Sequence, residues 1–394
     1  MAIVALFMAA GTAYGQDPVQ QAPVSDVVTK VDTPASTNTW FVRVAYSGTR
    51  VLTPSNLVSG ENVARTLTFD IGRQTDGTRD WHRLYNYPSY GVGVFIARFD
   101  QRQELGHPFA TYGFFSWPFP VSDRAQVTAD FGLGVSWNWT GFDPNTNPTN
   151  TALGSAVAYH IDGGVALRYL ANTRTSVYAG VNAAHWSNGG TKLPNLGLAV
   201  IGPTIGVRYN FASQVVPSRA RAADLPPFEP AWEFVVGGAG SLKNATAATN
   251  ALIDDVDRRR DFGVFNITTG LQRHFYRFGK VAAGTDVTYD GATGARMDVL
   301  GGERVESRAQ SDRRFTGGVY GGYEHVIARF SFLMQLGHTV WRSFDDADVP
   351  RFYQRYGARF HVSDHVWSTF AVRTTKWRKA NFLEFGLGYR VRWR

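Results

Sequence analysis

The chain has 394 residues, with 41 glycines, 14% aromatic residues, 18% charged residues and no cysteine. The lack of cysteine excludes a disulfide framework, a thiol nucleophile and a thiolate metal site. Beyond the N-terminus no apolar run approaches the roughly 18 residues that a membrane-spanning helix needs, which excludes helical insertion. Transmembrane strands remain, because they place apolar residues only at every second position.

The net charge is +8, and arginine supplies most of the 40 basic residues. Guanidinium groups match phosphate, which makes nucleic acid and phosphorylated lipid the two partner classes to weigh. Because the arginines are spread singly through strands and turns, we expect no nucleic-acid binding. An alternative remains open, in which most arginines fill a barrel interior or rim.

The N-terminus carries an apolar segment, residues 2–10, followed by a small-x-small site that ends at Gly15. This pattern predicts a signal peptide over residues 1–15, although the usual basic start is missing. The alternative is a disordered apolar tail. Residues 16–38, rich in Gln, Pro, Ser and Thr, predict a disordered lead-in.

Alternating segments separated by turn residues follow. In residues 155–170, Val165 and Leu167 share one face, while Asp162 and Arg168 share the other. A water-free sandwich core would not tolerate the second face, whereas a barrel lumen would. The first region, 39–211, has predicted strands at 40–47, 65–74, 89–99, 109–117, 125–139, 155–170, 175–187 and 198–211.

Residues 212–231 contain four prolines and predict a linker. The second region, 232–394, has predicted strands at 232–241, 261–276, 280–290, 314–326, 328–341, 351–363, 365–375 and 380–393. The expected fold is an all-β, antiparallel transmembrane barrel of about 16 strands in two eight-strand halves. A single large barrel is slightly preferred, while the long linker favours two tandem barrels.

The most informative motif is HWSNGG at 185–190. His185 and Ser187 are two residues apart, so they share one face of the predicted strand, together with Val177 and Val181. A hydroxyl is a weak nucleophile until an imidazole takes its proton. The pair on an apolar face therefore predicts an esterase that works on lipid. The alternative is a polar hairpin end, since Ser-Asn-Gly-Gly is ordinary turn chemistry.

The motif continues as KLPNLG at 192–197. Together the two segments resemble the lipid A 3-O-deacylase (acyloxyacyl hydrolase) family of outer-membrane β-barrels, in the longer type with a second set of strands. The resemblance covers about residues 40–211. The first hexapeptide is shared with outer-membrane phospholipase A, whereas the continuation favours the deacylase.

The resemblance implies that Ser187 attacks the ester of a 3-O-linked acyl chain on lipid A, with His185 as general base and then general acid. Asn188, with the backbone amide of Gly189 or Gly190, would stabilise the oxyanion. No cofactor and no metal are implied. The expected protein is embedded in the bacterial outer membrane with lipopolysaccharide as its substrate, and its oligomeric state is left open.

One position departs from the family. A glutamate is expected fourteen residues after the histidine, where this chain has Ala199. Loss of a triad acid costs about 10⁴-fold in turnover without abolishing it. Either Asn195 orients the imidazole instead, or the enzyme works as a dyad, or this member is impaired.

The alternatives are a phospholipase A-type acyl hydrolase, and a catalytically impaired barrel that binds lipid or passes solutes. Other polar residues are given structural roles. His160 and Asp162 are expected to pair in a lumen, and Glu384 to face inward. His361 and His365 flank a predicted turn, so we expect no metal site there.

Overall fold

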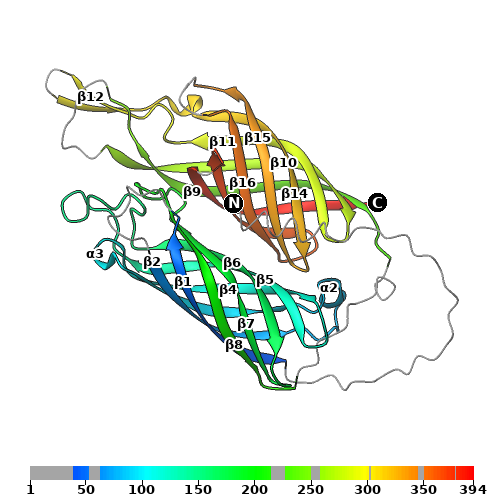
Figure 1. The fold of residues 1–394 in the computed structure, drawn as a ribbon. Helices are drawn as coiled ribbons and strands as arrows, with labels where there is room; N and C mark the ends of the chain where they lie inside the picture. The colour runs from blue at the N-terminus through cyan, green and yellow to red at the C-terminus, as the bar shows by residue number, and fades with distance from the viewer. Residues whose placement is uncertain are drawn as a thin grey trace.

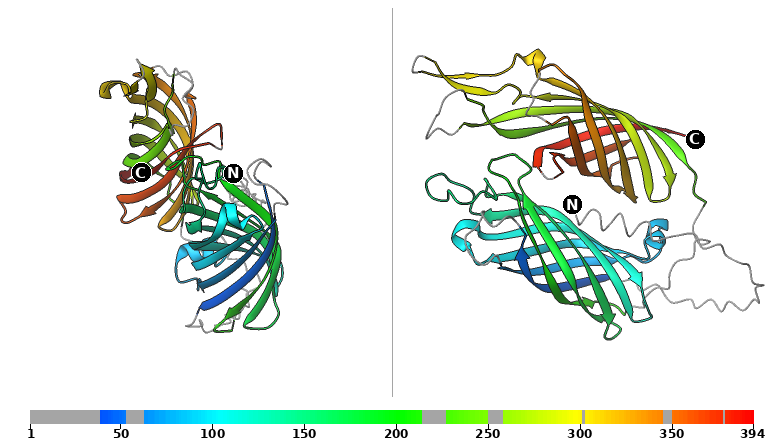
Figure 2. Two further views of the ribbon diagram at one scale, coloured as in Figure 1. Left: turned by 90° about the vertical axis from the view of Figure 1, so that its left-hand side faces the viewer. Right: turned by 45° about the horizontal axis from the view of Figure 1, so that its top comes forward.

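The computed structural model describes residues 39–52, 63–213, 227–249, 258–300, 303–344, 350–377 and 379–394. The predicted signal peptide and lead-in lie outside these ranges, as does most of the predicted linker. The described chain is all-β and forms two closed antiparallel barrels of eight strands each, which lie side by side (Figures 1 and 2). Within the described ranges, no helix has the length and apolar character needed to cross a membrane.

The first barrel occupies the region between Trp40 and Asn210. Its strands are β1 (Trp40–Val51), β2 (Val63–Gln74), β3 (Ser89–Phe99), β4 (Gly106–Pro120), β5 (Ala125–Trp139), β6 (Ala158–Leu170), β7 (Thr175–Ser187) and β8 (Leu198–Asn210). Each strand pairs with the next, and β1 pairs with β8 to close the sheet. Two short helices, α2 (Asp80–Leu84) and α3 (Arg102–Leu105), lie in the connections that flank β3.

The second barrel closes in the same way, through pairing of β18 with β9. Its strands are β9 (Ala231–Thr246), β10 (Arg259–Tyr276), β11 (Gly279–Asp290), β14 (Phe315–Ile327), β15 (Phe330–Arg342), β16 (Phe352–His361), β17 (Val366–Thr375) and β18 (Lys379–Trp393). Between β11 and β14 lie a separate hairpin, β12 (Arg296–Leu300) and β13 (Glu303–Ser307), and a short 3-10 helix, η2 (Ser311–Arg313).

The number and places of the barrel strands agree with the sequence prediction. The structure has two barrels, whereas the sequence slightly favoured a single large one. The sheet closes twice, because β8 pairs back onto β1 and does not pair with β9. Eight strands give a barrel whose interior side chains fill it. The tandem arrangement, which the linker favoured, is therefore the one the structure has.

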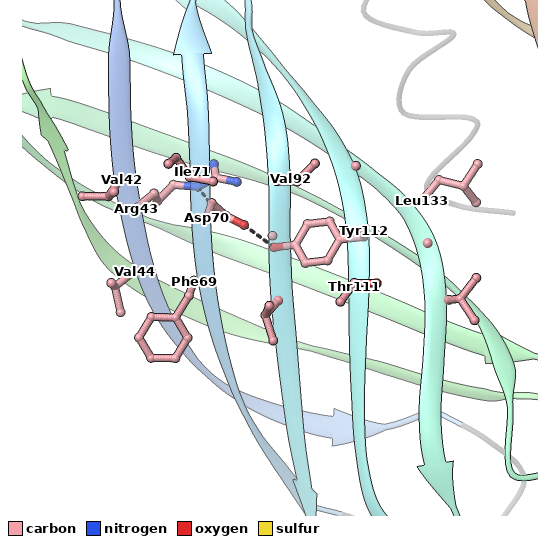
Figure 3. A pocket seen from close by; sticks show the side chains of 15 residues that line it. Val42, Arg43, Val44, Phe69, Asp70, Ile71, Val92, Thr111, Tyr112 and Leu133 are labelled. Carbon is pink, nitrogen blue, oxygen red and sulfur yellow. Dashed lines mark hydrogen bonds and ion pairs between the residues drawn. The ribbon is translucent and has the colours of Figure 1, made fainter.

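Alternation along the strands separates an apolar outside from a polar inside. In the first barrel Val42, Val44 and Phe69 point outward and are exposed, whereas Arg43 and Asp70 point inward (Figure 3). Arg43 forms ion pairs with Asp70 and Asp130, both at 2.7 Å, and the Tyr112 hydroxyl donates to Asp70. These three inward charges are therefore paired, which offsets the cost of burying them.

The second lumen is also filled by paired charges. Arg355 contacts Glu384 at 2.6 Å, and Glu324 accepts from Arg359 at 2.6 Å. Lys280, which is 2% exposed, lies 2.9 Å from Glu233. Glu384 thus faces inward, as predicted. Paired inward side chains thus lie in both lumens.

Both barrels have a loop end and a terminal end. In the first barrel, residues 140–157 and 188–197 connect strands at the loop end, and the strand ends at Trp40 and Asn210 mark the terminal end. The terminal ends of the two barrels touch through an aromatic cluster. Tyr85 packs there against Phe278 of the second barrel, with ring centroids 5.0 Å apart. In outer-membrane barrels the longer loops are extracellular.

Candidate functional site

The predicted catalytic pair lies at the loop end of β7, on the outer face of the first barrel. Val177 and Val181, at the same parity, are exposed on this face. Pairing with the neighbouring strands places Ala199 of β8 opposite His185, and Tyr159 of β6 opposite Ser187. Strand parity therefore places both side chains on one outward face, about 7 Å apart along the strand.

Two hydrogen-bond donors point at the Ser187 hydroxyl. The Asn195 side-chain amide donates from Nδ2 to Ser187 Oγ at 2.9 Å, and the Gly189 backbone N–H donates to the same oxygen at 3.1 Å. Among the described residues, Ser187 has no hydrogen bond with His185. Hydrogen-bond donors that reach a serine oxygen can also stabilise the oxyanion that develops next to it during acyl transfer.

Asn188 is used inside the loop, not at the serine. Its Nδ2 donates to Lys192 O at 2.6 Å and to Ser155 Oγ at 3.2 Å, and its Oδ1 accepts from Gly190 N at 3.0 Å. The side chain is 2% exposed. Both Asn188 and the Gly190 N–H are thus occupied in holding the loop, which leaves Gly189 as the predicted oxyanion donor that reaches Ser187.

His185 lies against the backbone at Gly197. A Cβ added to Gly197 would stand 2.7 Å from His185 Cε1, and the φ of +75° also favours glycine. Ala199 occupies the cross-strand position where a carboxylate would reach the imidazole. In the described part of the chain no hydrogen bond joins Asn195 to His185, because Asn195 is turned toward Ser187.

The second barrel also contacts the loop that carries the site. Leu383 of β18 packs on Gly189, where a Cβ would lie 2.4 Å from Leu383 Cδ2. Asn244 of β9 donates its backbone N–H to Gly190 O at 2.9 Å, and its Oδ1 accepts from Leu193 N at 3.1 Å. Neither Leu383 nor Asn244 could be recognised from the sequence, in which Gly189 is the one sign of a close approach because it has no side chain.

The remaining predicted residues lie away from the site. His160 and Asp162 face the first lumen as expected, with His160 Nε2 at 3.2 Å from Asp162 Oδ1. His361 is buried in the second lumen, whereas His365 is exposed and stacks on Tyr389. The two histidines of the apparent metal spacing therefore have separate surroundings.

A serine, a histidine and a glutamate also meet inside the second barrel. Ser331 Oγ donates to Glu324 Oε1 at 2.6 Å and lies 3.3 Å from His361 Nε2. Glu324 Oε1 lies 3.6 Å from this same nitrogen, His361 Nε2. In a hydrolytic triad the serine and the carboxylate contact different nitrogens of the imidazole. Ser331 is fully buried and Glu324 pairs with Arg359, so this cluster is structural.

Comparison with known proteins gives two family matches. Residues 67–215 match the model described as lipid A 3-O-deacylase (PagL), and residues 231–393 match the model described as acyloxyacyl hydrolase, C-terminal domain. A search of curated proteins found no match.

Two solved structures are similar to parts of the chain. One is the outer membrane enzyme PagL, with 19% identity and a TM-score of 0.29, over 43% of this chain and 99% of that one. Another is a mutant porin of Rh. blastica, with 8% identity and a TM-score of 0.18, over 89% of this chain and 99% of that one. At TM-scores this low, neither likeness bears on function.

The apolar outer faces and polar, filled lumens define the class: an integral β-barrel membrane protein. The two family models together span well over half of the chain. The chain belongs to the lipid A 3-O-deacylase family, in the longer form with a second, C-terminal domain. It is therefore an outer-membrane protein of a family of hydrolases.

Proposed function

We propose that the protein is a serine esterase that removes a 3-O-linked acyl chain from lipid A, with Ser187 as nucleophile and His185 as general base. The observation that supports this most is the Ser187 hydroxyl, which faces outward beside His185 and accepts hydrogen bonds from Gly189 and Asn195. The loop end, which carries the pair, is then the extracellular rim, where lipid A resides. Residues 1–15 serve as a cleaved signal peptide.

The reaction begins when His185 takes the proton of the Ser187 hydroxyl and Oγ attacks the ester carbonyl carbon. The carbonyl oxygen becomes an oxyanion, which the Gly189 N–H and Asn195 Nδ2 stabilise. The bond between the acyl carbon and the 3-oxygen of the sugar breaks, and His185 returns the proton to that oxygen. A water molecule, with His185 again as base, then attacks the acyl-enzyme. His185 returns the second proton to Ser187 Oγ as the fatty acid leaves.

This mechanism assigns Asn195 to the oxyanion and not to the imidazole. Ser187 Oγ has to turn from Asn195 toward His185 before attack, as is common in substrate-free enzymes, where catalytic hydrogen bonds are long or absent. Without a carboxylate opposite it, His185 works with Ser187 as a dyad. The pair therefore supports slow turnover relative to a complete triad.

The substrate class is tested with the full-length protein, folded in detergent micelles and given lipid A or phospholipid in parallel. We expect mass spectrometry to find free fatty acid from lipid A and a lipid A product lighter by one acyl chain. Release from phospholipid alone would assign the site to a phospholipase. Release from neither would leave a lipid-binding barrel.

Gly197 provides a second test of the site. The Gly197→Ala variant is expected to lose about 100-fold in kcat on lipid A, since a misplacement of about 1 Å has that cost and the new Cβ would displace the His185 ring. The positive φ adds about 1 kcal/mol of strain. Lipid A deacylation rates, measured beside thermal unfolding, check this.

The matched control is Gly77→Ala, because Gly77 also has a positive φ, +85°, but lies at the terminal end of the first barrel. It should show similar strain with unchanged kcat. Equal losses of activity in the two variants would mean that Gly197 acts through stability alone.

A further inference from the structure

The facing walls of the two barrels leave a space between them. A cavity of about 130 Å³ lies between β5 and β6 of the first barrel and β14 to β17 of the second. Its walls are outward-facing side chains, with Leu133 and Ile161 on one side and Phe332, Ala358 and Phe370 on the other. An apolar cavity of about 150 Å³ stays dry and binds apolar molecules.

The cavity remains apolar although His325 contributes to its wall. The Tyr85 hydroxyl lies 3.2 Å from His325 Nε2, and the Tyr323 hydroxyl lies 3.1 Å from Nδ1. Both ring nitrogens therefore already have partners in the protein. A ligand in the cavity meets carbon and needs no polar group of its own.

The cavity lies beside the catalytic pair. Ile161 is the cross-strand partner of His185, and Tyr159 is the partner of Ser187. Neighbouring strands are about 4.8 Å apart. Phe370 lines the cavity and also packs on Tyr159, with ring centroids 5.0 Å apart. The space thus begins one strand away from the serine, on the same outer face.

The space continues toward the terminal end. A second hollow of about 460 Å³ shares Phe131, Leu133, Phe332 and Ala358 with the first, and it reaches the turn at Ala328. We name the two hollows together the inter-barrel slot. It runs from the strand beside the site along the barrel walls, which is the direction that lipid acyl chains take in a bilayer.

Contacts at both ends hold the two barrels apart at a fixed spacing. At the loop end, Asn244 is hydrogen-bonded to Gly190 and Leu193. At the terminal end, the Tyr85 hydroxyl donates to Val326 O and its ring packs on Phe278. The slot between these contacts is a built feature, because neither barrel can move toward the other without breaking them.

We propose that the inter-barrel slot binds the acyl chain whose ester Ser187 cleaves, so that the second barrel forms one wall of the acyl-binding site. This inference rests on the proposed esterase function. Burial of a chain in a preformed apolar slot favours binding through the hydrophobic effect. It also explains, in physical terms, why a second barrel without its own catalytic pair is packed against the first beside the serine.

The test fills the slot at Ala358, a half-buried, outward-facing residue shared by both hollows. The Ala358→Leu and Ala358→Trp variants of the full chain are assayed on p-nitrophenyl butyrate and p-nitrophenyl myristate in mixed micelles. We expect the ratio of kcat/KM for myristate to kcat/KM for butyrate to fall about 3-fold with leucine and at least 10-fold with tryptophan, because the short butyrate chain occupies less of the slot.

The matched control is Ala283→Trp, because Ala283 faces outward on β11 and does not line the slot. It should leave both rates unchanged. Gel mobility before and after heating reports whether each barrel is folded, and the smaller leucine change keeps the series informative if tryptophan prevents folding.

The assay distinguishes failure of the slot proposal from failure of the proposed esterase function. An unchanged myristate-to-butyrate ratio in folded Ala358→Leu and Ala358→Trp would overturn the slot as the acyl site while leaving the esterase intact. Wild-type protein that cleaves neither ester in a Ser187-dependent way would instead overturn the proposed function. A ratio that falls in step with side-chain size supports the inference.

Discussion

Replacing Ala199 with glutamate is expected to raise kcat on lipid A by up to about 10⁴-fold. Ala199 is the cross-strand partner of His185 on the outer face. Cβ atoms of such pairs are about 5 Å apart, so a glutamate there reaches the imidazole. A carboxylate at that place fixes the ring and stabilises the imidazolium, and its removal from known triads costs about 10⁴-fold. Steady-state deacylation of lipid A measures the gain.

Two substitutions at the same position separate charge from size. Ala199→Gln supplies a hydrogen bond without a full charge and should give a smaller increase. Ala199→Leu fills the space without either and should give none. If folded Ala199→Glu were no faster than wild type, the imidazole would not limit turnover, and the dyad mechanism would lose its main support.

Replacing Ser187 with alanine is expected to lower fatty acid release by about 100-fold in the native chain. Loss of the serine from a complete triad costs about 10⁶-fold and loss of the acid about 10⁴-fold, and such losses do not add. In a chain that already lacks the acid, removal of the serine can therefore lower the rate by only about a further 100-fold. The same change in the Ala199→Glu background should cost far more.

Ser176→Ala is the control, since Ser176 lies on the same strand but faces the lumen near the terminal end. Its activity should match that of the wild type. A protein-free incubation gives the rate of slow chemical hydrolysis, which is subtracted from the fatty acid release measured by mass spectrometry. Equal release by Ser187→Ala and wild type would remove the serine from the mechanism.

Alternation along the chain was enough to predict the barrel strands and their faces, but it did not predict the β12–β13 hairpin. The outward parity of His185 and Ser187 and the inward parity of Glu384 follow from the two-residue period of a strand. Closure could not be predicted in this way. Strand β8 would show the same alternation of apolar and polar residues whether it paired with β1 or with β9. This alternation therefore fits one barrel as well as two.

The details of the site depend on contacts that the local sequence does not contain. Asn188 and Asn195 stand seven residues apart in one loop, and nothing in their residue type says which one turns toward Ser187. The structure assigns that contact to Asn195 because Lys192 O and Ser155 occupy the Asn188 amide. Leu383 and Asn244 come from another barrel, and only three-dimensional packing brings them to the loop.

The double closure of the sheet has a consequence for how such a chain is built up. Each barrel closes its own strand pairing, since β1 pairs with β8 and β9 pairs with β18. If one barrel were added to the chain or removed from it at the connecting segment, the other barrel would keep all its strand pairs. No unpaired strand edge would be exposed, and the register of the remaining strands would not change. The two halves are thus modules that evolution can join or separate whole, with the coupling between them carried by side chains and a few loop hydrogen bonds alone.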